Sequence, residues 1–250
     1  MPLFLIGKLA FEDTDGLIAF TRFGDFALLA WNSFSLASIT AIAAVLVSLL
    51  LAYANRRDSA WPIRAAKRAV GLGYAVPGTV IAVGILIPVT MLDHKLADTL
   101  SALIGRDTGL LLTGGVMVLI YAYLIRFMAI SLQTIDAGFS KITLSMDDAA
   151  RSLGLNNQQI VRRVHAPLLR TSLITAGLMV FVDVMKELPA TLVMRPFNFD
   201  TLAVRTYIFA KDERLGEAAV AALAIVLVGL IPVVLASRAI TRDERQSGAA

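Results

Sequence analysis

The sequence predicts an all-α fold, a polytopic membrane protein with five membrane-spanning helices. Three observations lead to this prediction. Of the 250 residues, 57% are hydrophobic and only 17% are charged, whereas a soluble domain carries about a quarter charged residues. Several long stretches contain no charged residue at all, and about 20 apolar residues suffice for a helix to cross the hydrocarbon core. The charged residues gather between these stretches, as in membrane proteins.

Five stretches have the length and composition of spans. Their approximate limits are residues 26–55, 69–92, 108–130, 168–187 and 218–237. The first is longer than a span needs, which predicts a tilted helix or one that extends past the bilayer. Residues 1–25 form an N-terminal segment with no stretch long enough to span, and residues 241–250 form a polar tail.

The second span is rich in small residues and prolines. Small residues permit close helix contact, and proline is tolerated in membranes where neighbours satisfy the freed carbonyls. A helix that faces lipid gains nothing from them, so the pattern favours tight packing or a position along a pathway. We therefore take Pro77 and Gly78 as candidate pathway residues. The whole set is Gly71, Gly73, Pro77, Gly78, Gly84 and Pro88.

The distribution of basic residues predicts the orientation. With the N-terminus outside, the cytoplasmic segments hold twelve Lys and Arg residues, against eight in the outer segments. The short segment 55–68 carries five of them, and short loops weigh most in the positive-inside rule. We therefore expect the interval 131–167 and the tail in the cytoplasm. Basic loops also explain the net charge of +4 without nucleic-acid binding.

Within that interval, the residues predict two short helices. Asp147 and Arg151 are spaced i,i+4 in the first helix, and Gly154 is expected to end it. Asn156 or Asn157 can cap the second helix, and Pro167 is expected to stop it.

The same interval contains five apolar residues whose side chains we expect to be covered by other protein surface. A short amphipathic element of this kind suits a groove on a cytosolic partner, although a solvated connector has a similar composition. The apolar set is Leu153, Leu155, Ile160, Val161 and Val164.

The spacing of the interval resembles the EAA loop in the permease subunits of binding-protein-dependent ABC importers. That pattern is Glu-Ala-Ala, three residues, Gly, nine residues and Ile-x-Leu-Pro. The chain keeps the spacing, with Asp, Val and Ala in place of Glu, Ile and Leu. The resemblance implies a five-span importer-permease core, residues 26–240, whose cytoplasmic coupling helix pair, residues 144–167, contacts the ATP-hydrolysing subunit. The implied coupling residues are Asp148, Ala149, Ala150, Arg151, Gly154, Val164 and Pro167.

Residues 186–203 resemble part of the C-terminal half of ferric-iron permeases, proteins in which two homologous halves are fused. The resemblance implies one half that pairs with a second permease half, either homologous or identical. It also implies ferric iron as the substrate, while thiamine, polyamine, sulfate and molybdate permeases share the general pattern and stay open. The matching residues are Lys186-Glu187-Leu188-Pro189-Ala190-Thr191-Leu192, Arg195-Pro196-Phe197 and Phe199-Asp200-Thr201-Leu202-Ala203.

The family implies further partners and a location. Cytosolic ABC ATPase subunits would bind ATP and Mg, so no cofactor is expected in this chain. A periplasmic substrate-binding protein would deliver the cargo. The chain would be a multi-pass protein of the bacterial inner membrane, surrounded by lipid and without nucleic-acid partners.

Three ionisable residues near the end of the fourth span share one helical face: Asp183, Lys186 and Glu187. At bilayer depth each costs about 2.5–3.5 kcal/mol, so such groups face a bundle interior or water. Three interpretations stay open. The residues form an internal ion pair that fixes the span, or they belong to a gate or pathway together with Pro189. Alternatively, the helix ends near Val182 and they lie at the outer interface.

Other classes of function fit the residues less well. The chain has no cysteine, and His94 and His165 are too far apart to predict a metal site; His165 is expected to be a polar surface residue. The chain lacks the G-x-x-x-x-G-K-[ST] phosphate loop, so we expect neither a motor nor an enzyme. A proton-coupled secondary transporter would leave the spacing from Asp148 to Pro167 unexplained. An intramembrane enzyme would need a convergent acid–base or metal cluster.

Overall fold

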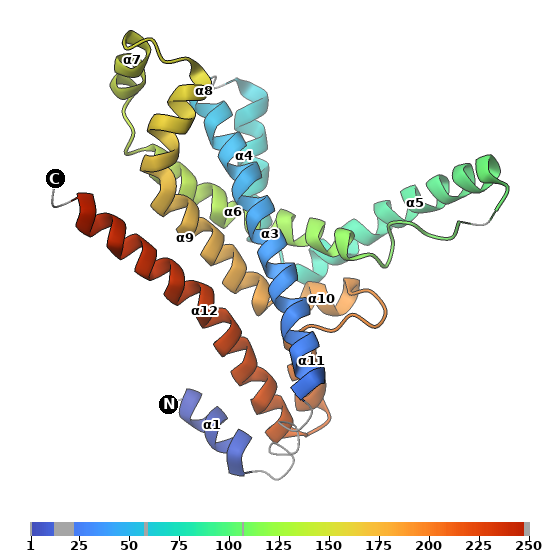
Figure 1. Ribbon diagram of the computed structural model, residues 1–250. Helices are drawn as coiled ribbons and strands as arrows, with labels where there is room; N and C mark the ends of the chain where they lie inside the picture. The colour runs from blue at the N-terminus through green and yellow to red at the C-terminus, as the bar shows by residue number, and fades with distance from the viewer. Residues whose placement is uncertain (1, 13–22, 58–59, 107, 248–250) are drawn as a thin grey trace.

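The structure, a computed structural model, describes residues 2–12, 23–57, 60–106 and 108–247. The described residues form helices joined by turns and loops, which confirms the all-α prediction (Figure 1). The elements are α1 (Pro2–Glu12), α3 (Phe23–Arg57), α4 (Trp61–Gly73), α5 (Gly78–Ile104), α6 (Val116–Phe139), α7 (Leu144–Ser152), α8 (Asn157–Ile160), η1 (Val161–His165), α9 (Ala166–Met185), α10 (Pro189–Met194), α11 (Leu202–Lys211) and α12 (Leu215–Ser247).

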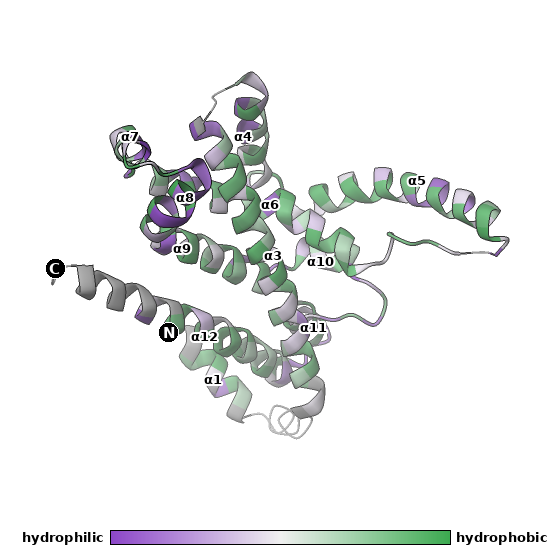
Figure 2. Ribbon diagram, turned by 45° about the horizontal axis from the view of Figure 1, so that its top comes forward, coloured by the Kyte–Doolittle hydropathy of each residue, from purple (hydrophilic) through white to green (hydrophobic). Residues whose placement is uncertain are grey.

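Helices α3, α6 and α9 pack against one another and form the centre of the molecule. Small side chains such as Ala37, Ala122 and Ala176 are fully or almost fully buried there, which lets the helix backbones approach closely. Helix α12 crosses α9, and α1 lies against α12. Figure 2 shows that α3, α6 and α9 are mostly hydrophobic, whereas the hydrophilic colour gathers at α7 and α8 at one end of this core.

Among the described residues, five helical segments are long and apolar enough to cross a membrane, which agrees with the predicted number. They are Phe26–Arg56, Gly78–Ile104, Val116–Phe139, Asn157–Met185 and Leu215–Leu235. The first and the last agree with the predicted spans 26–55 and 218–237 to within a few residues. Of the predicted N-terminal segment, residues 13–22 lie outside the described part of the chain, and so do residues 248–250 of the predicted tail.

The predicted second span, residues 69–92, was wrong in its limits. Helix α4 ends at Gly73, residues 74–77 form a turn, and α5 begins at Gly78. Pro77 has no N–H to donate and disfavours helical geometry at Val76, so the helix is interrupted at this point. Pro77 then becomes the N-cap residue of α5.

Helix α5 continues past residue 92, the predicted end of the second span, because the buried carboxylate of Asp93 is stabilised. The Asp93 carboxylate accepts hydrogen bonds of 2.6–3.0 Å from the backbone N–H groups of Leu111, Leu112 and Thr113. These residues belong to the non-helical segment 108–115, whose Gly109 and Gly114 adopt positive φ. The predicted third span, residues 108–130, was therefore wrong as well, since α6 begins only at Val116.

The predicted fourth span, residues 168–187, begins too late. The chain is helical without interruption from Asn157 to Met185, through α8, η1 and α9. Pro167 lies in the first turn of α9 and does not stop the helix. The preceding turn, η1, is π-helical, and the N–H of Ala166 donates to the carbonyl of Val161. This wider turn accommodates the proline, whose ring would clash with an α-helical carbonyl.

Helix α5 projects from the core on the side opposite α12 (Figure 1). One face of its first turns is buried, including Ile81, Ala82 and Ile85. Beyond them many large apolar side chains are exposed, among them Ile87, Met91 and Leu103. An exposed surface with this many large apolar side chains needs lipid or another protein chain to cover it.

Candidate functional site

The predicted coupling segment forms a helical corner at the polar end of the core. Helix α7 ends at Ser152, and Gly154 follows with φ 78°, a conformation that glycine adopts without a steric penalty. The Asn156 side chain accepts a hydrogen bond from the Gln159 N–H at 2.9 Å, and Gln159 Oε1 accepts from the Asn156 N–H at 2.8 Å. This capping box begins α8. The predicted end at Gly154 is confirmed, and of the two predicted cap residues, Asn156 and Asn157, the structure has Asn156 as the cap.

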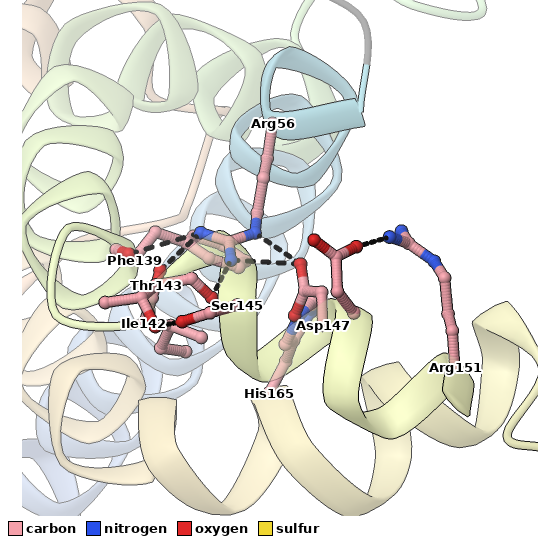
Figure 3. Close-up of polar contacts among 9 residues, drawn as sticks. Arg56, Phe139, Ile142, Thr143, Ser145, Asp147, Arg151 and His165 are labelled. Atoms are coloured by element: carbon pink, nitrogen blue, oxygen red, sulfur yellow. Dashed lines mark hydrogen bonds and ion pairs between the residues drawn. The ribbon is translucent and has the colours of Figure 1, made fainter. Parts of the chain in front are cut away.

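Asp147 connects α7 to two spans (Figure 3). Its Oδ2 atom accepts hydrogen bonds from Arg56 Nε at 3.1 Å and Arg56 Nη2 at 3.0 Å. Its Oδ1 atom lies 2.7 Å from His165 Nε2. Arg56 comes from the end of α3 and His165 from η1, so one carboxylate joins three helices. We call these three residues the Asp147 hub.

Arg56 also fixes the turn that leads into α7. Its guanidinium donates to the carbonyl oxygens of Ile142 at 2.8 Å, Thr143 at 3.2 Å and Phe139 at 3.4 Å. The same guanidinium lies 5.7 Å from the centre of the Phe139 ring, within cation–π range. Arginine suits this position because its planar fork presents five donors. The start of α7 is thereby held against the end of α3.

The hub keeps Asp147 ionised. Burial of the Asp147 carboxyl opposes ionisation, but the hydrogen bonds from His165 and Arg56 outweigh burial and lower the pKa of Asp147 below its usual value. The carboxylate therefore carries its charge throughout the neutral range. The Asp147 side chain is only 7% exposed and that of Arg56 14%, so the pair is shielded from solvent.

In this segment one residue spacing makes no contact, and one prediction was wrong. Asp147 does not pair with Arg151, whose Nη1 instead lies 2.8 Å from Asp148 Oδ1 on the exposed face of α7. His165 is not a surface residue, since it is only 3% exposed and packs edge-on against Tyr53 and Phe139. The partners of Asp147 lie 91 and 18 residues away in the sequence, and no local spacing indicates them.

The remaining coupling residues divide between the two faces of the corner. Asp148, Ala149, Arg151 and Pro167 are exposed, Val164 is half-buried, and Ala150 is buried. Of the apolar set, Ile160 is covered by the chain itself, whereas Leu153 is 82% exposed. Leu144 and Met146, which lie outside that predicted apolar set, are exposed as well.

A second polar group lies where two helix interruptions meet. The turn 74–77 separates α4 from α5, and residues 186–188 separate α9 from α10. Between them, Arg126 Nη1 of α6 lies 3.5 Å from Glu187 Oε1. Gly78 packs against this pair so closely that an added Cβ would collide with the Arg126 guanidinium and lie 2.6 Å from Glu187 Oε1. The structure thus brings together Gly78 and Glu187, both predicted pathway residues, and adds Arg126.

The predicted ionisable group of the fourth span forms two separate pairs. Asp183 Oδ1 lies 2.8 Å from Lys186 Nζ, and the Lys186 side chain is 65% exposed. Glu187 lies beyond the end of α9 and pairs with Arg126 instead. Of the other predicted pathway residues, Pro77 caps α5 and Pro189 begins α10. The Thr191 hydroxyl, which donates to the Glu187 carbonyl oxygen, also bonds to the Tyr123 hydroxyl.

The chemistry of this second group is that of an incompletely satisfied ion pair. Arg126 Nε and Nη1 are buried and make no hydrogen bond, although Nη1 faces Glu187. Within the described ranges, no group of three or more His, Asp or Glu residues is placed to hold a metal ion. The group therefore holds a charge pair, and its described residues present no metal-ligand set.

Known proteins resemble this chain in sequence, although no protein-family model matches it. The maltose/maltodextrin transport system permease protein MalG of Escherichia coli K12 is 32% identical over 235 residues, which cover 91% of this chain and 73% of MalG. The Fe(3+)-transport system permease protein FbpB 2 of Haemophilus influenzae is 27% identical over 213 residues. That match covers 85% of this chain and only 39% of FbpB 2.

Solved structures share the fold. A bacterial ABC transporter involved in the import of the acidic polysaccharide alginate matches with a TM-score of 0.71 and 14% identity, over 98% of this chain and 88% of the other. The bacterial alginate ABC transporter in complex with an alginate pentasaccharide-bound periplasmic protein matches with a TM-score of 0.68 and 16% identity. That match covers 96% of this chain and 87% of the other.

These relatives are membrane permeases of transport systems, and their named roles are not enzymatic. The chain belongs to the permease subunits of ABC importers and is a multi-pass membrane protein. Within that family, the resemblance to ferric-iron permeases noted in residues 186–203 is supported at low identity by FbpB 2.

Proposed function

We propose that this chain forms half of the translocation path of an ABC importer and that a cytosolic ATPase drives it through α7. The observation that carries the proposal is the arrangement of α7. One face of this helix is free for a partner, and the other is tied by Asp147 to two spans.

The free face of α7 has the chemistry of a docking surface. Leu144, Met146 and Leu153 expose apolar area, and the Asp148–Arg151 pair lies beside them with side-chain exposures of 71% and 56%. A short amphipathic helix of this kind suits a groove on another protein. The proposed partner is the ATPase subunit, which would bind the ATP and Mg.

The Asp147 hub then explains how force would reach the membrane. Because Asp147 bonds to Arg56 of α3 and His165 of η1, a displacement of α7 pulls on both helices together. Closure of two ATPase subunits on ATP would move α7 and tilt α3 and α9 relative to α6. The resulting alternation between outward and inward access is the proposed transport cycle.

The proposed path runs along the polar group between the two helix interruptions. Ionisable side chains at bilayer depth face a bundle interior or water, and discontinuous helices are frequent at the substrate sites of transporters. Lys186 and Tyr74 are exposed there and need an aqueous or protein cover. A second permease half, packed against α5, would close the path from the other side.

Ferric iron is the proposed substrate, delivered by a periplasmic binding protein. Support comes from the name of FbpB 2 and from the match in residues 186–203. Thiamine, polyamine, sulfate and molybdate remain alternatives, because MalG and the alginate transporter show that similar permeases serve chemically different cargoes. The proposed location is the bacterial inner membrane, with the N-terminus outside and the C-terminus in the cytoplasm.

Replacement of Gly154 tests the coupling role in proteoliposomes that contain the complete transporter. Gly154→Val places a β-branched residue at φ 78°, whereas Gly154→Asn tolerates that conformation. We expect the valine variant to lose both uptake and the stimulation of ATP hydrolysis, and the asparagine variant to keep both. Full uptake and stimulation by the valine variant would refute the coupling role. Uptake without any ATPase, driven by a proton gradient, would favour the secondary-transporter alternative.

A further inference from the structure

A groove runs between α3 and α9 on the side of the core that α12 borders. It consists of two adjoining hollows of about 680 and 640 Å³, and Leu173 lines both. The α3 wall contains Ile42, Leu46 and Leu50, spaced by four residues and hence on one helical face. These side chains are 62%, 55% and 68% exposed, so the groove is open along its length.

The groove is long enough to span the hydrocarbon of one leaflet of a bilayer. Its α3 wall extends from Ser38 to Tyr53, a distance of about 22 Å at 1.5 Å per residue. Half of the hydrocarbon core is about 15 Å thick. The groove therefore reaches from the interior of the membrane to its surface, at the end where α7 lies.

The two ends of the groove differ in chemistry. The lining is apolar from the inner end as far as Leu169, apart from Ser38. Arg162, Asn157 and Gln158 line the end near α7. A guanidinium beside amide donors is suited to a phosphate group, and basic pockets between helices at the cytoplasmic surface bind anionic headgroups.

We propose that this groove binds one anionic phospholipid, with an acyl chain between α3 and α9 and the phosphate at Arg162. The proposed second permease half packs elsewhere, against α5. Pro232 and Leu235 of α12 complete the wall of the inner hollow, and the largely uncovered helix α5 projects on the opposite side of the core (Figures 1 and 2). The bound lipid would contact α3, η1 and α9, the helices that the Asp147 hub also joins. The proposal does not depend on the identity of the cargo.

Native mass spectrometry of the detergent-purified transporter tests the site, with phosphatidylglycerol and phosphatidylcholine of identical acyl chains as probes. We expect preferential retention of phosphatidylglycerol. Arg162→Gln should reduce that retention about fivefold, since one basic residue near an anionic lipid contributes about that factor. Arg163→Gln is the matched control, because this neighbouring exposed residue does not line the groove, and it should retain the lipid. Equal retention of both lipids, or equal effects of both substitutions, would overturn the proposal.

A second measurement identifies the occupant without removing a charge. The photoreactive residue benzoylphenylalanine replaces Leu46, which is exposed at the inner hollow, in the full transporter in phosphatidylglycerol-containing membranes. We expect irradiation to yield a lipid adduct on this chain. A crosslink to a second permease chain or another protein subunit would show that protein covers the groove and would overturn the proposal.

Discussion

Asp147 of α7 and Arg56 of α3 lie 91 residues apart in the sequence, and their side chains meet at 3.0 Å. The second oxygen of the same carboxylate contacts His165 at 2.7 Å. One charged group therefore determines how α7 sits on two spans, while the outer face of α7 stays free. Changes at Asp147 should alter this connection and leave the docking face intact, which separates coupling from docking by experiment.

Asp147→Asn should weaken the hub. The amide keeps the size of the side chain but leaves the Arg56 guanidinium without its counter-charge. Because hydrogen bonds to charged groups contribute about 1.5–3 kcal/mol, we expect a loss of stability of about 1–3 kcal/mol, measured by unfolding in detergent. ATP hydrolysis by the assembled transporter should persist, with fewer substrate molecules taken up per ATP.

Asp148→Asn is the matched control for the stability measurement. Its carboxylate pairs with Arg151 on the exposed face, and exposed pairs contribute about 0–1 kcal/mol. A loss of stability in Asp148→Asn equal to that in Asp147→Asn would contradict the special role of the hub. Unchanged transport per ATP in Asp147→Asn would contradict its role in coupling.

The hub also predicts a dependence on pH. The folded state lowers the pKa of Asp147, so this carboxylate adds stability above the pKa that it has in the unfolded chain, about 3.9. That contribution disappears as the pH falls through the lower pKa of the folded state. The difference in stability between the native chain and Asp147→Asn should therefore be constant from pH 7 to about pH 5 and should narrow below about pH 4. A difference that instead narrows between pH 7 and pH 6 would point to another group.

The sequence was sufficient for the fold class because hydropathy alone identifies spans, and for the corner at Gly154 because that turn is local. The sequence was insufficient where contacts between residues distant in the chain determine the limits of a helix. The sequence predicted that the second span ends near Leu92, yet α5 continues through Asp93 because the N–H groups of Leu111, Leu112 and Thr113 bind its carboxylate. No pattern near Asp93 indicates those partners.

The same reason accounts for the missed members of the candidate site. Arg126 was visible only as a charge near the end of a predicted span, and its partner Glu187 lies in another helical segment. His165 was placed on the surface because a lone histidine near a proline gives no sign of burial. The π-helical turn before Pro167 depends on backbone hydrogen bonds, which proline rules applied to sequence do not anticipate.

Gly78→Ala should disturb the polar group between the helix interruptions. The new Cβ would collide with the Arg126 guanidinium and crowd Glu187 Oε1, and overpacking of this kind costs about 1–3 kcal/mol. Gly84→Ala is the control on the same helix, since nothing lies within 4 Å of its added Cβ. It should be neutral or stabilising by up to about 1 kcal/mol. Equal melting temperatures of the two variants in detergent would contradict the close packing at Gly78.

Asp93→Asn should release the non-helical segment 108–115 from α5. The amide can present only one acceptor oxygen to the backbone N–H groups that the carboxylate now binds, and its NH₂ group faces donors. Loss of one charge-assisted hydrogen bond shifts a local opening equilibrium about tenfold or more. We therefore expect hydrogen exchange at Leu111, Leu112 and Thr113 to accelerate by at least about tenfold, while exchange in α6 stays slow. The exposed residue Asp98 lies on the same helix, and Asp98→Asn should leave this exchange unchanged. If both substitutions accelerated exchange to the same extent, loss of charge along α5, and not the carboxylate contact of Asp93, would be the cause.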